Sequence, residues 1–586
     1  MKTFSVILIC LIAPALLKAA RTKTFNSSAV STIQVAMRDG VKLSTDIYRP
    51  AVNEKEVAGK FPVLVTRTPY GKSGERQLGK FFAEHGYVFV AQDVRGRYPS
   101  EGRLYPLRDE GPDGYDTIQW AAVQSWSNGK VGTLGASYLG MDQYGAALLK
   151  PPALVAMYVA VAGFSYYQDA AYHGGVRGTG WPVWLLFSAS TSRKADLDPK
   201  LKQQLSTTVK SPEDWLMQSP VEREKLFAGF PDQLRVYRDF YAHLLFDDYW
   251  KQPGFDPGDY LRNMKDVPII MIGGWYDPFT DSMLSTFPKL AKLQRTDKKI
   301  RIGPWPHPYG KPVCGQASFG EQARLDEKNL QLDWFDHWMR GEPFKIVDKS
   351  PVRYFRMGGT GARAIDVSHV SPAGSWQTAN SWPPAGVVKR KLYLGAAGFL
   401  GAAPPPSPIP TTYTLDPIHP KATLGGRYGP TCIQNQLVKR PDVISFVSDP
   451  LKSSLNVTGT VDLQLWAGSN REDTDFTATL IDVYPDGYAM NLAEGQIRAT
   501  YRHGNQRLEP MKPAEIYQFS IHLGATSNLF EKGHRIRLDI SSSNFPKLEP
   551  NPGETPFHGG KPLTATNFLY HDVQHSSYLE LSVLPD

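Results

Sequence analysis

Short apolar runs and helix-forming stretches alternate along the first 350 residues, and this alternation limits the possible folds more than any other feature. Stretches with helical periodicity, such as residues 79–85 and 115–124, lie between runs that are each long enough for one strand. This order is typical of a parallel sheet with helices on its faces. The sequence therefore predicts an α/β fold, preceded by a β-hairpin over residues 31–49. The apolar runs occupy residues 62–66, 87–92, 152–161, 267–272 and 299–302.

The α/β pattern is interrupted once and then ends. Residues 164–265 lack strand alternation and carry large aromatic residues among helix formers, which predicts a helical cap insertion. This insertion divides the α/β domain into residues 21–163 and 266–350. From residue 351 to residue 586 the pattern changes to short alternating runs separated by Gly, Pro and Asn, which predicts a β-sandwich or jelly roll.

Residues 1–20 differ from the rest of the chain. Lys2 precedes an apolar run over residues 4–17, and Lys18 and two alanines follow it. This pattern is typical of a secretory signal peptide, and the run is shorter than the roughly 20 residues that a membrane-spanning helix needs. The sequence therefore predicts export to the periplasm or the medium. An uncleaved N-terminal anchor is the alternative, because Lys18 disturbs the small-residue spacing before the cut.

Composition argues against several classes of partner. A net charge of +8 over 586 residues is mild, and without a dense Lys/Arg run it does not indicate a nucleic-acid partner. Hydrophobic residues at 41% and charged residues at 21% are close to globular averages, so stable membrane insertion is not expected. No Cys/His cluster has zinc spacing, and neither a metal nor another cofactor is predicted. Cys314 and Cys432 either pair in an oxidising compartment or remain two buried thiols.

A serine lies where a predicted strand passes into a predicted helix, in Gly135-Ala136-Ser137-Tyr138-Leu139-Gly140. A serine at such a corner presents its hydroxyl on a tight turn, as the nucleophile does in α/β-hydrolases. The glycine spacing is one residue looser than the usual Gly-x-Ser-x-Gly, and Gly71-Lys72-Ser73 also fits Gly-x-Ser. From the motif alone, a turn serine without chemistry is an equal alternative.

An acid and a histidine follow Ser137 in the order that an α/β-hydrolase requires. Asp277 comes shortly after the run at 267–272, and His307 comes shortly after the run at 299–302. The interval between them leaves room for one helix and one strand. The sequence therefore predicts Ser137 as nucleophile, His307 as general base and Asp277 as the acid that orients it.

Acyl transfer also needs donors for the oxyanion of the tetrahedral intermediate. The first predicted donor is the backbone N–H of Tyr138, directly after the nucleophile. A second donor normally comes from the loop after an early strand, here residues 66–71, where Tyr70 could supply its hydroxyl. On its own, Tyr70 would more readily be interpreted as a structural loop tyrosine.

Five motifs together resemble the CocE/NonD hydrolases, a family that includes cocaine esterases, X-Pro dipeptidyl-peptidases, α-amino acid ester hydrolases and glutaryl acylases. The resemblance implies an α/β-hydrolase domain, a helical cap and a C-terminal jelly roll that meet at the site. It implies the same triad, an oxyanion hole of Tyr70 and the Tyr138 N–H, and Phe279 as a wall of the acyl pocket. The charges of residues 93–102 are expected to be structural. The motifs lie at residues 69–71, 93–102, 135–140, 275–277 and 303–307.

The predicted function is hydrolysis of a small-molecule ester, with an amide as the alternative substrate, through an acyl-enzyme. The enzymatic alternatives are an X-Pro dipeptidyl-peptidase and an acylase acting on β-lactam or glutaryl amides. X-Pro cleavage needs an acid that holds the substrate amine, and the sequence does not identify one. A different class is an inert carbohydrate-binding protein, against which the complete set of predicted catalytic residues argues. Ser127 and Lys130 match Ser-x-x-Lys by chance, because Gly129 breaks the helix which that motif requires.

Overall fold

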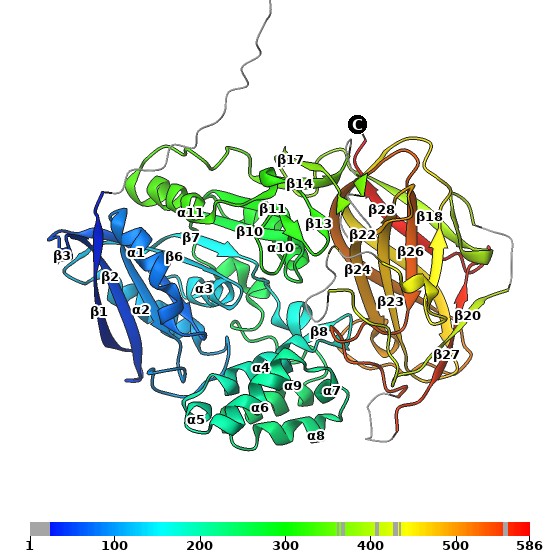
Figure 1. The fold of residues 1–586 in the computed structure, drawn as a ribbon, viewed down its shortest axis with the longest axis horizontal. Helices are drawn as coiled ribbons and strands as arrows, with labels where there is room; N and C mark the ends of the chain where they lie inside the picture. Colours follow the sequence, from blue (N-terminus) through cyan, green and yellow to red (C-terminus); the bar gives the residue numbers. More distant parts are fainter. Residues whose placement is uncertain are drawn as a thin grey trace, which may run out of the picture.

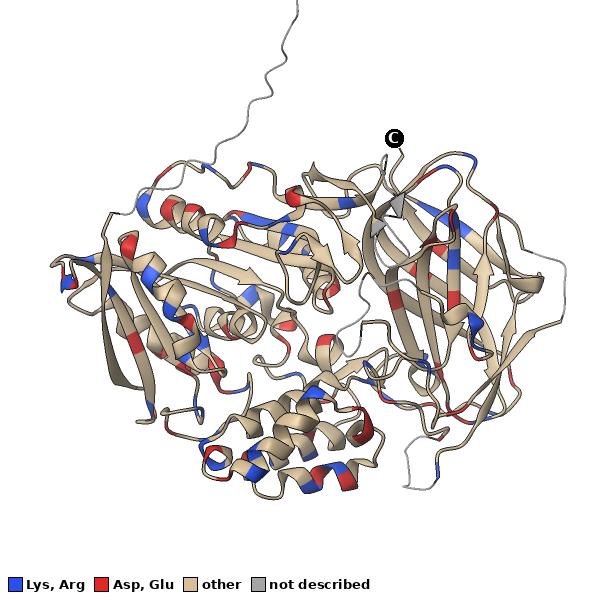
Figure 2. Ribbon diagram, viewed as in Figure 1, with Lys and Arg blue, Asp and Glu red and all other residues tan. Residues whose placement is uncertain are grey.

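The computed structural model describes residues 24–359, 363–364, 370–404, 409–425, 432, 435–554 and 561–585. An α/β lobe and a β-rich lobe lie side by side, with a layer of helices below them (Figure 1). The predicted signal peptide at residues 1–20 lies outside the described residues. In the described part of the chain, every helix is too short or too polar to cross a bilayer. Basic residues (Lys and Arg) and acidic residues (Asp and Glu) are mixed over the ribbons of both lobes (Figure 2).

The α/β lobe contains a mixed sheet whose central strands are parallel, in the order β1-β2-β5-β4-β6-β7-β10-β11-β14. The predicted hairpin at its edge is confirmed, because β1 and β2 pair in antiparallel register. The strands are β1 (Ser27–Ala36), β2 (Lys42–Val52), β4 (Phe61–Thr68), β5 (Val88–Asp93), β6 (Ser127–Ala136), β7 (Leu154–Ala160), β10 (Ile269–Tyr276), β11 (Lys298–Pro306) and β14 (Val352–Gly358).

Helices cover both faces of this sheet, which confirms the predicted α/β-hydrolase class. Ile270 and Met271 are neighbours on β10 but belong to different cores, because successive strand residues face opposite sides. One core lies under α1 and α11, and the other lies under α2, α3 and α10. These helices are α1 (Arg76–Glu84), α2 (Glu110–Ala122), α3 (Tyr138–Leu148), α10 (Thr280–Leu293) and α11 (Glu327–Phe335).

The strands β10 and β11 are longer than the sequence predicted. The apolar runs end before Gly273 and Gly303, but both glycines continue the strands. A Cβ on Gly274 would lie 2.2 Å from the backbone oxygen of Trp305 on the neighbouring strand, and a Cβ on Gly303 would lie 2.4 Å from the Trp305 ring on its own strand, so both positions require glycine. The consequence is that Asp277 and His307 stand directly at the ends of their strands.

A group of helices lies between β7 and β10 in the sequence and forms the lower layer in Figure 1. The expectation that residues 164–265 contain no strand is wrong in one place. Strands β8 (Tyr172–His173) and β9 (Val176–Arg177) form a small hairpin, whose turn uses Gly174 and Gly175 at positive φ. The helices are α4 (Gly180–Ser190), α5 (Arg193–Asp196), α6 (Pro199–Lys210), α7 (Glu213–Leu216), α8 (Pro220–Glu224) and α9 (Pro231–Ala242).

The β-rich lobe is built from long antiparallel strands in two packed layers. In one layer β22 pairs with β25, β27 and β28; in the other, β23 pairs with β24 and β26. The rings of Phe476 and Phe519 meet between the layers, with centroids 4.8 Å apart. These strands are β22 (Leu455–Ser469), β23 (Asp475–Val483), β24 (Ala489–Arg498), β25 (Tyr517–Phe530), β26 (Arg535–Ser541), β27 (Ala565–Tyr570) and β28 (Tyr578–Val583).

A buried ion pair joins the β-rich lobe to the helical layer, which is the group of helices between β7 and β10. Glu549 forms an ion pair of 2.5 Å with Arg223 of α8 and also accepts a hydrogen bond from Tyr241 of α9. Burial opposes the charge of Glu549, but the nearby guanidinium groups of Arg223 and Arg177 lower its pKa to about 2. The carboxylate therefore stays ionised at neutral pH and holds the helical layer against the β-rich lobe.

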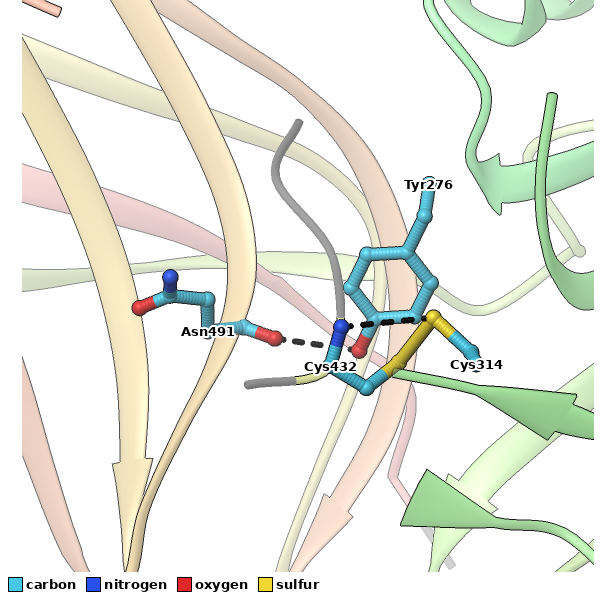
Figure 3. The surroundings of a disulfide bond; sticks show 4 residues. All are labelled: Tyr276, Cys314, Cys432 and Asn491. Atoms are coloured by element: carbon cyan, nitrogen blue, oxygen red, sulfur yellow. Dashed lines mark hydrogen bonds between the residues drawn. A yellow bond between two sulfur atoms is a disulfide. The ribbon is translucent and has the colours of Figure 1, made fainter. Parts of the chain in front are cut away.

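A disulfide joins Cys314, in the segment that follows His307, to Cys432 of the C-terminal part. The sequence left pairing and free thiols open, and the structure contains the pair. Figure 3 shows the bond beside Tyr276, whose hydroxyl donates to the backbone oxygen of Asn491 at 3.0 Å. The bond therefore joins the two lobes close to the strand end that carries Asp277.

Replacing both cysteines by alanine should lower the free energy of unfolding by about 4 kcal/mol, because the bond closes a loop of 118 residues. Denaturant unfolding with and without a reducing agent measures the effect. Reduction should destabilise the natural protein and leave the double variant unchanged. An equal response of both proteins to the reducing agent would contradict the prediction.

Candidate active site

Ser137 occupies a strained turn between β6 and α3. Its φ of 58° and ψ of −123° are unusual for a residue with a side chain, and Ala160 at the end of β7 accepts a hydrogen bond from its N–H at 2.9 Å. A side chain on Gly135 would collide with Leu139, and a Cβ on Gly140 would lie 2.6 Å from the Cβ of Ala162. The loose glycine spacing of the motif therefore has a packing reason, since the helix approaches β7 at Gly140.

The structure brings the three predicted residues together in a continuous chain of hydrogen bonds. Nε2 of His307 lies 3.0 Å from Oγ of Ser137, and Nδ1 of His307 lies 2.5 Å from Oδ2 of Asp277. The second carboxylate oxygen of Asp277 accepts the backbone N–H of Phe279 at 2.9 Å. The Asp277 side chain is fully buried, whereas 19% of the His307 side chain is exposed. The acid is fixed in place, and the imidazole faces the side from which a substrate can arrive.

The charge of Asp277 raises the pKa of His307. Burial alone would lower the pKa of His307, but the carboxylate charge and its hydrogen bond outweigh burial and raise this pKa above the ordinary value of 6.5. A carboxylate in this position would favour the imidazolium if His307 accepted the proton of Ser137. The arrangement can therefore generate a serine nucleophile and stabilise the charge that the proton transfer creates.

Tyr70 lies close to Tyr138, with ring centroids 6.4 Å apart, in the loop that follows β4. Three residues of the segment 93–102 hold this loop. Asp93 accepts the N–H of Lys72 at 2.7 Å, and Arg97 donates to the oxygen of Pro69 at 2.9 Å. Tyr98 donates its hydroxyl to the backbone oxygen of Tyr70 at 2.7 Å. The segment was predicted to be structural, and these contacts hold the loop that carries Tyr70.

Tyr138 is anchored through its side chain as the first residue of α3. Its hydroxyl donates to Glu110 at 2.6 Å and accepts the N–H of Leu107 at 3.1 Å. Glu110 is in turn paired with the buried guanidinium of Arg67 at 2.8 Å. Burial raises the pKa of Tyr138 well above its ordinary value, so the phenol remains a donor. The backbone N–H that was predicted as an oxyanion donor therefore belongs to a residue that is fixed through its backbone in α3 and through its side-chain hydroxyl.

Aromatic side chains lie against His307 and Tyr70. The half-buried ring of Phe279 packs edge-on against His307, with centroids 5.4 Å apart. Tyr70 contacts Phe187, and Trp184 donates its indole N–H to the Tyr70 hydroxyl at 3.1 Å. Sequence reasoning did not assign a role to Trp184, although the aromatic content of residues 164–265 was visible. Periodicity alone could not tell which of these rings turns toward Tyr70.

A cavity of about 710 Å³ reaches the strand end at Asp277 but is not lined by Ser137 or His307. Besides Asp277, two nearly buried carboxylates face it, Asp169 and Asp256, and neither belongs to an ion pair among the described residues. Burial raises the pKa of Asp169 to about 8; burial and the charge of Asp259 raise that of Asp256 to about 7. The cavity is therefore a polar chamber beside Asp277.

Two family models match the chain. The model described as X-Pro dipeptidyl-peptidase (S15 family) matches residues 39–309, and the model of the X-Pro dipeptidyl-peptidase C-terminal non-catalytic domain matches residues 345–580. Cocaine esterase from Rhodococcus sp. (strain MB1 Bresler) is 30% identical, and the alignment covers 95% of this chain and 99% of the esterase. The match extends over both lobes.

Solved structures share the fold over nearly the whole chain. An α-amino acid ester hydrolase is 23% identical with a TM-score of 0.78, covering 98% of this chain and all of its own. An aminopeptidase from a marine sediment archaeon, Thaumarchaeota archaeon, is 22% identical with a TM-score of 0.77, covering 99% of this chain and all of its own. A CocE/NonD family hydrolase from Staphylococcus aureus is 21% identical with a TM-score of 0.67, covering 96% of this chain and 98% of its own.

Proposed function

Since this chain is a serine hydrolase of the S15 family and a relative of cocaine esterase, we propose that it cleaves acyl esters through an acyl-enzyme on Ser137. One observation carries this proposal: the hydrogen bonds that connect Ser137, His307 and Asp277 in the order that acyl transfer needs. The strained turn at Ser137 supports it, because such strain is common where a nucleophile must be exposed.

The proposed reaction proceeds in two halves. Oγ of Ser137 attacks the ester carbonyl while Nε2 of His307 accepts its proton, and Asp277 stabilises the resulting imidazolium. The oxyanion of the tetrahedral intermediate accepts hydrogen bonds from the Tyr138 N–H and the Tyr70 hydroxyl. His307 then gives the proton to the departing alcohol. In the second half, water attacks the acyl-enzyme by the same route and releases the carboxylic acid.

Cleavage of X-Pro dipeptides is the second candidate, and the cavity beside Asp277 favours it. A substrate with a free terminal amine needs a carboxylate within reach, and Asp169 faces this cavity without a paired cation in the described chain. An ammonium ion bound there would favour the ionised form of Asp169, whose pKa burial raises to about 8.

A substrate panel distinguishes the two candidates. We expect p-nitrophenyl esters to be hydrolysed with a higher kcat/KM than X-Pro p-nitroanilides or β-lactam amides. Asp169→Asn should leave the esters unaffected, and Asp259→Asn, at the exposed rim of the same cavity, is its matched control. If only X-Pro anilides are cleaved, and Asp169→Asn lowers that activity about 10- to 100-fold, the second candidate replaces the first. A folded protein that does not react with a fluorophosphonate would instead favour an inert carbohydrate-binding protein.

We also propose that the protein works outside the cytoplasm. The disulfide between Cys314 and Cys432 supports this location, because such bonds persist in oxidising compartments. The apolar run near the N-terminus, after Lys2, supports it independently. Fractionation of cells that produce the full chain tests it: activity confined to the cytoplasm would refute the proposal.

A further inference from the structure

We propose that Trp184 of α4 is a positioning residue that sets the direction of the Tyr70 hydroxyl in the oxyanion hole. This inference rests on the proposed function, in which Tyr70 donates to the oxyanion. Its central observation is the hydrogen bond of 3.1 Å from Nε1 of Trp184 to the hydroxyl oxygen of Tyr70. The helical layer would thereby act directly on the catalytic machinery of the α/β lobe.

The indole of Trp184 is held between two other rings. Tyr138 stacks on it with an interplanar angle of 8° and centroids 5.7 Å apart. Trp181, three residues earlier on α4, stacks with it at 7° and 4.9 Å. Because the indole cannot tilt without losing both stacks, its N–H keeps one direction. The hydrogen bond to Tyr70 therefore comes from a donor with little freedom.

The stack is anchored at its base by a buried ion pair. Glu110 accepts a hydrogen bond from the Tyr138 hydroxyl and pairs with Arg67, and all three side chains are buried. Moving this group would expose or unpair two charges in the interior, which is costly. The ring of Tyr138 is consequently a fixed surface against which Trp184 rests.

Arg97 ties the Tyr70 loop to the helix of Trp184. Its guanidinium donates to the oxygen of Pro69 at 2.9 Å, to the oxygen of Ser188 at 2.7 Å and to the hydroxyl of Thr191 at 2.7 Å. Ser188 belongs to α4 and Thr191 ends it, whereas Pro69 immediately precedes Tyr70. Arg97 is 2% exposed, so water competes little for these bonds. The loop and the helix therefore keep a constant separation, and the bond between Tyr70 and Trp184 is maintained.

The indole bond has two consequences for Tyr70. A phenol oxygen that accepts an N–H must direct its own proton elsewhere, which reduces the number of orientations that the hydroxyl samples. Accepting a hydrogen bond also polarises the hydroxyl and makes it a better donor. Both effects favour the transition state, where the oxyanion develops, more than the bound substrate. Loss of the indole N–H should therefore lower kcat and leave KM nearly unchanged.

The test is a double-mutant cycle on Trp184→Phe and Tyr70→Phe, read by the hydrolysis of p-nitrophenyl acetate and hexanoate and by the rate at which a fluorophosphonate labels Ser137. We expect Trp184→Phe to lower kcat and the labelling rate about five- to tenfold, by the same factor for both esters. Tyr70→Phe should cost about 10²- to 10³-fold, and the double variant should be no slower than Tyr70→Phe. Trp215→Phe, which removes an indole hydrogen bond to Arg223 elsewhere in the helical layer, is the matched control and should react normally.

Each other outcome overturns a defined part of the proposal. Effects that multiply in the double variant, or that differ between acetate and hexanoate, would make Trp184 an independent wall of the acyl pocket. An unchanged rate in Trp184→Phe would remove its role and leave the oxyanion hole as proposed. An unchanged rate in Tyr70→Phe would remove Tyr70 from the oxyanion hole, and this inference with it. If Trp184→Phe does not fold, Trp184→Leu takes its place in the cycle, because it also lacks the N–H.

Discussion

Ser137→Ala should lower kcat for ester hydrolysis by about 10⁶-fold, the loss that follows removal of a nucleophilic serine from an intact triad. The hydroxyl 3.0 Å from Nε2 of His307 is the group that forms the acyl-enzyme in the proposed reaction, and alanine offers no replacement. The variant should fold normally, because the unusual backbone at position 137 is held by hydrogen bonds of the main chain. Steady-state hydrolysis of a p-nitrophenyl ester and labelling with a fluorophosphonate measure the loss.

Ser73→Ala is the matched control. Ser73 also fits Gly-x-Ser, but it is exposed in the short helix η1 (Lys72–Glu75). This variant should keep its full rate and should still be labelled. If Ser137→Ala retained a tenth of the activity, or if labelling moved to another residue, the assignment of the nucleophile would be wrong.

The arrangement of Ser137, Asp277 and His307 could be predicted because all three stand at strand ends, and strand order is readable from the sequence. Parallel strands present their carboxyl ends at one edge of the sheet, so residues that follow β6, β10 and β11 must meet there. The prediction of Asp277 and His307 required only this rule and the order in which an α/β-hydrolase carries its serine, acid and histidine. The strand lengths were less predictable, because the apolar runs end before Gly273 and Gly303, whereas both strands continue through these glycines.

The surroundings of the triad could not be predicted in the same way. The bond from Trp184 to Tyr70, the cavity with Asp169 and the pairing of Cys314 with Cys432 all depend on how separate layers dock. Docking is set by side-chain packing between segments that are far apart in the sequence. Such packing produces no periodic residue pattern from which it could be predicted. The segment 93–102 illustrates the limit: its charges were expected to be structural, but the carbonyls that Arg97 contacts in two layers were not visible in the sequence.

Asp277→Asn should lower kcat by about 10⁴-fold, although the side chain keeps its shape and burial. An amide in place of the carboxylate favours the wrong tautomer of His307 and no longer stabilises the imidazolium. The pH dependence should change as well. Because the Asp277 charge and hydrogen bond raise the pKa of His307, their loss lets burial lower it. Activity needs the neutral imidazole, so the rising limb of the kcat/KM profile should move to lower pH while its height falls.

Asp281→Asn is the control for this change. It removes an equal charge four residues later, from an ion pair of 3.0 Å with His522 of the β-rich lobe, and it leaves the carboxylate of Asp277 in place. This variant should keep the natural kcat and the natural position of the rising limb. A profile for Asp277→Asn that falls in height without moving would mean that another group limits the rate at low pH. A shift to higher pH would contradict the assigned role outright, because removing a negative charge beside His307 can only favour its neutral form.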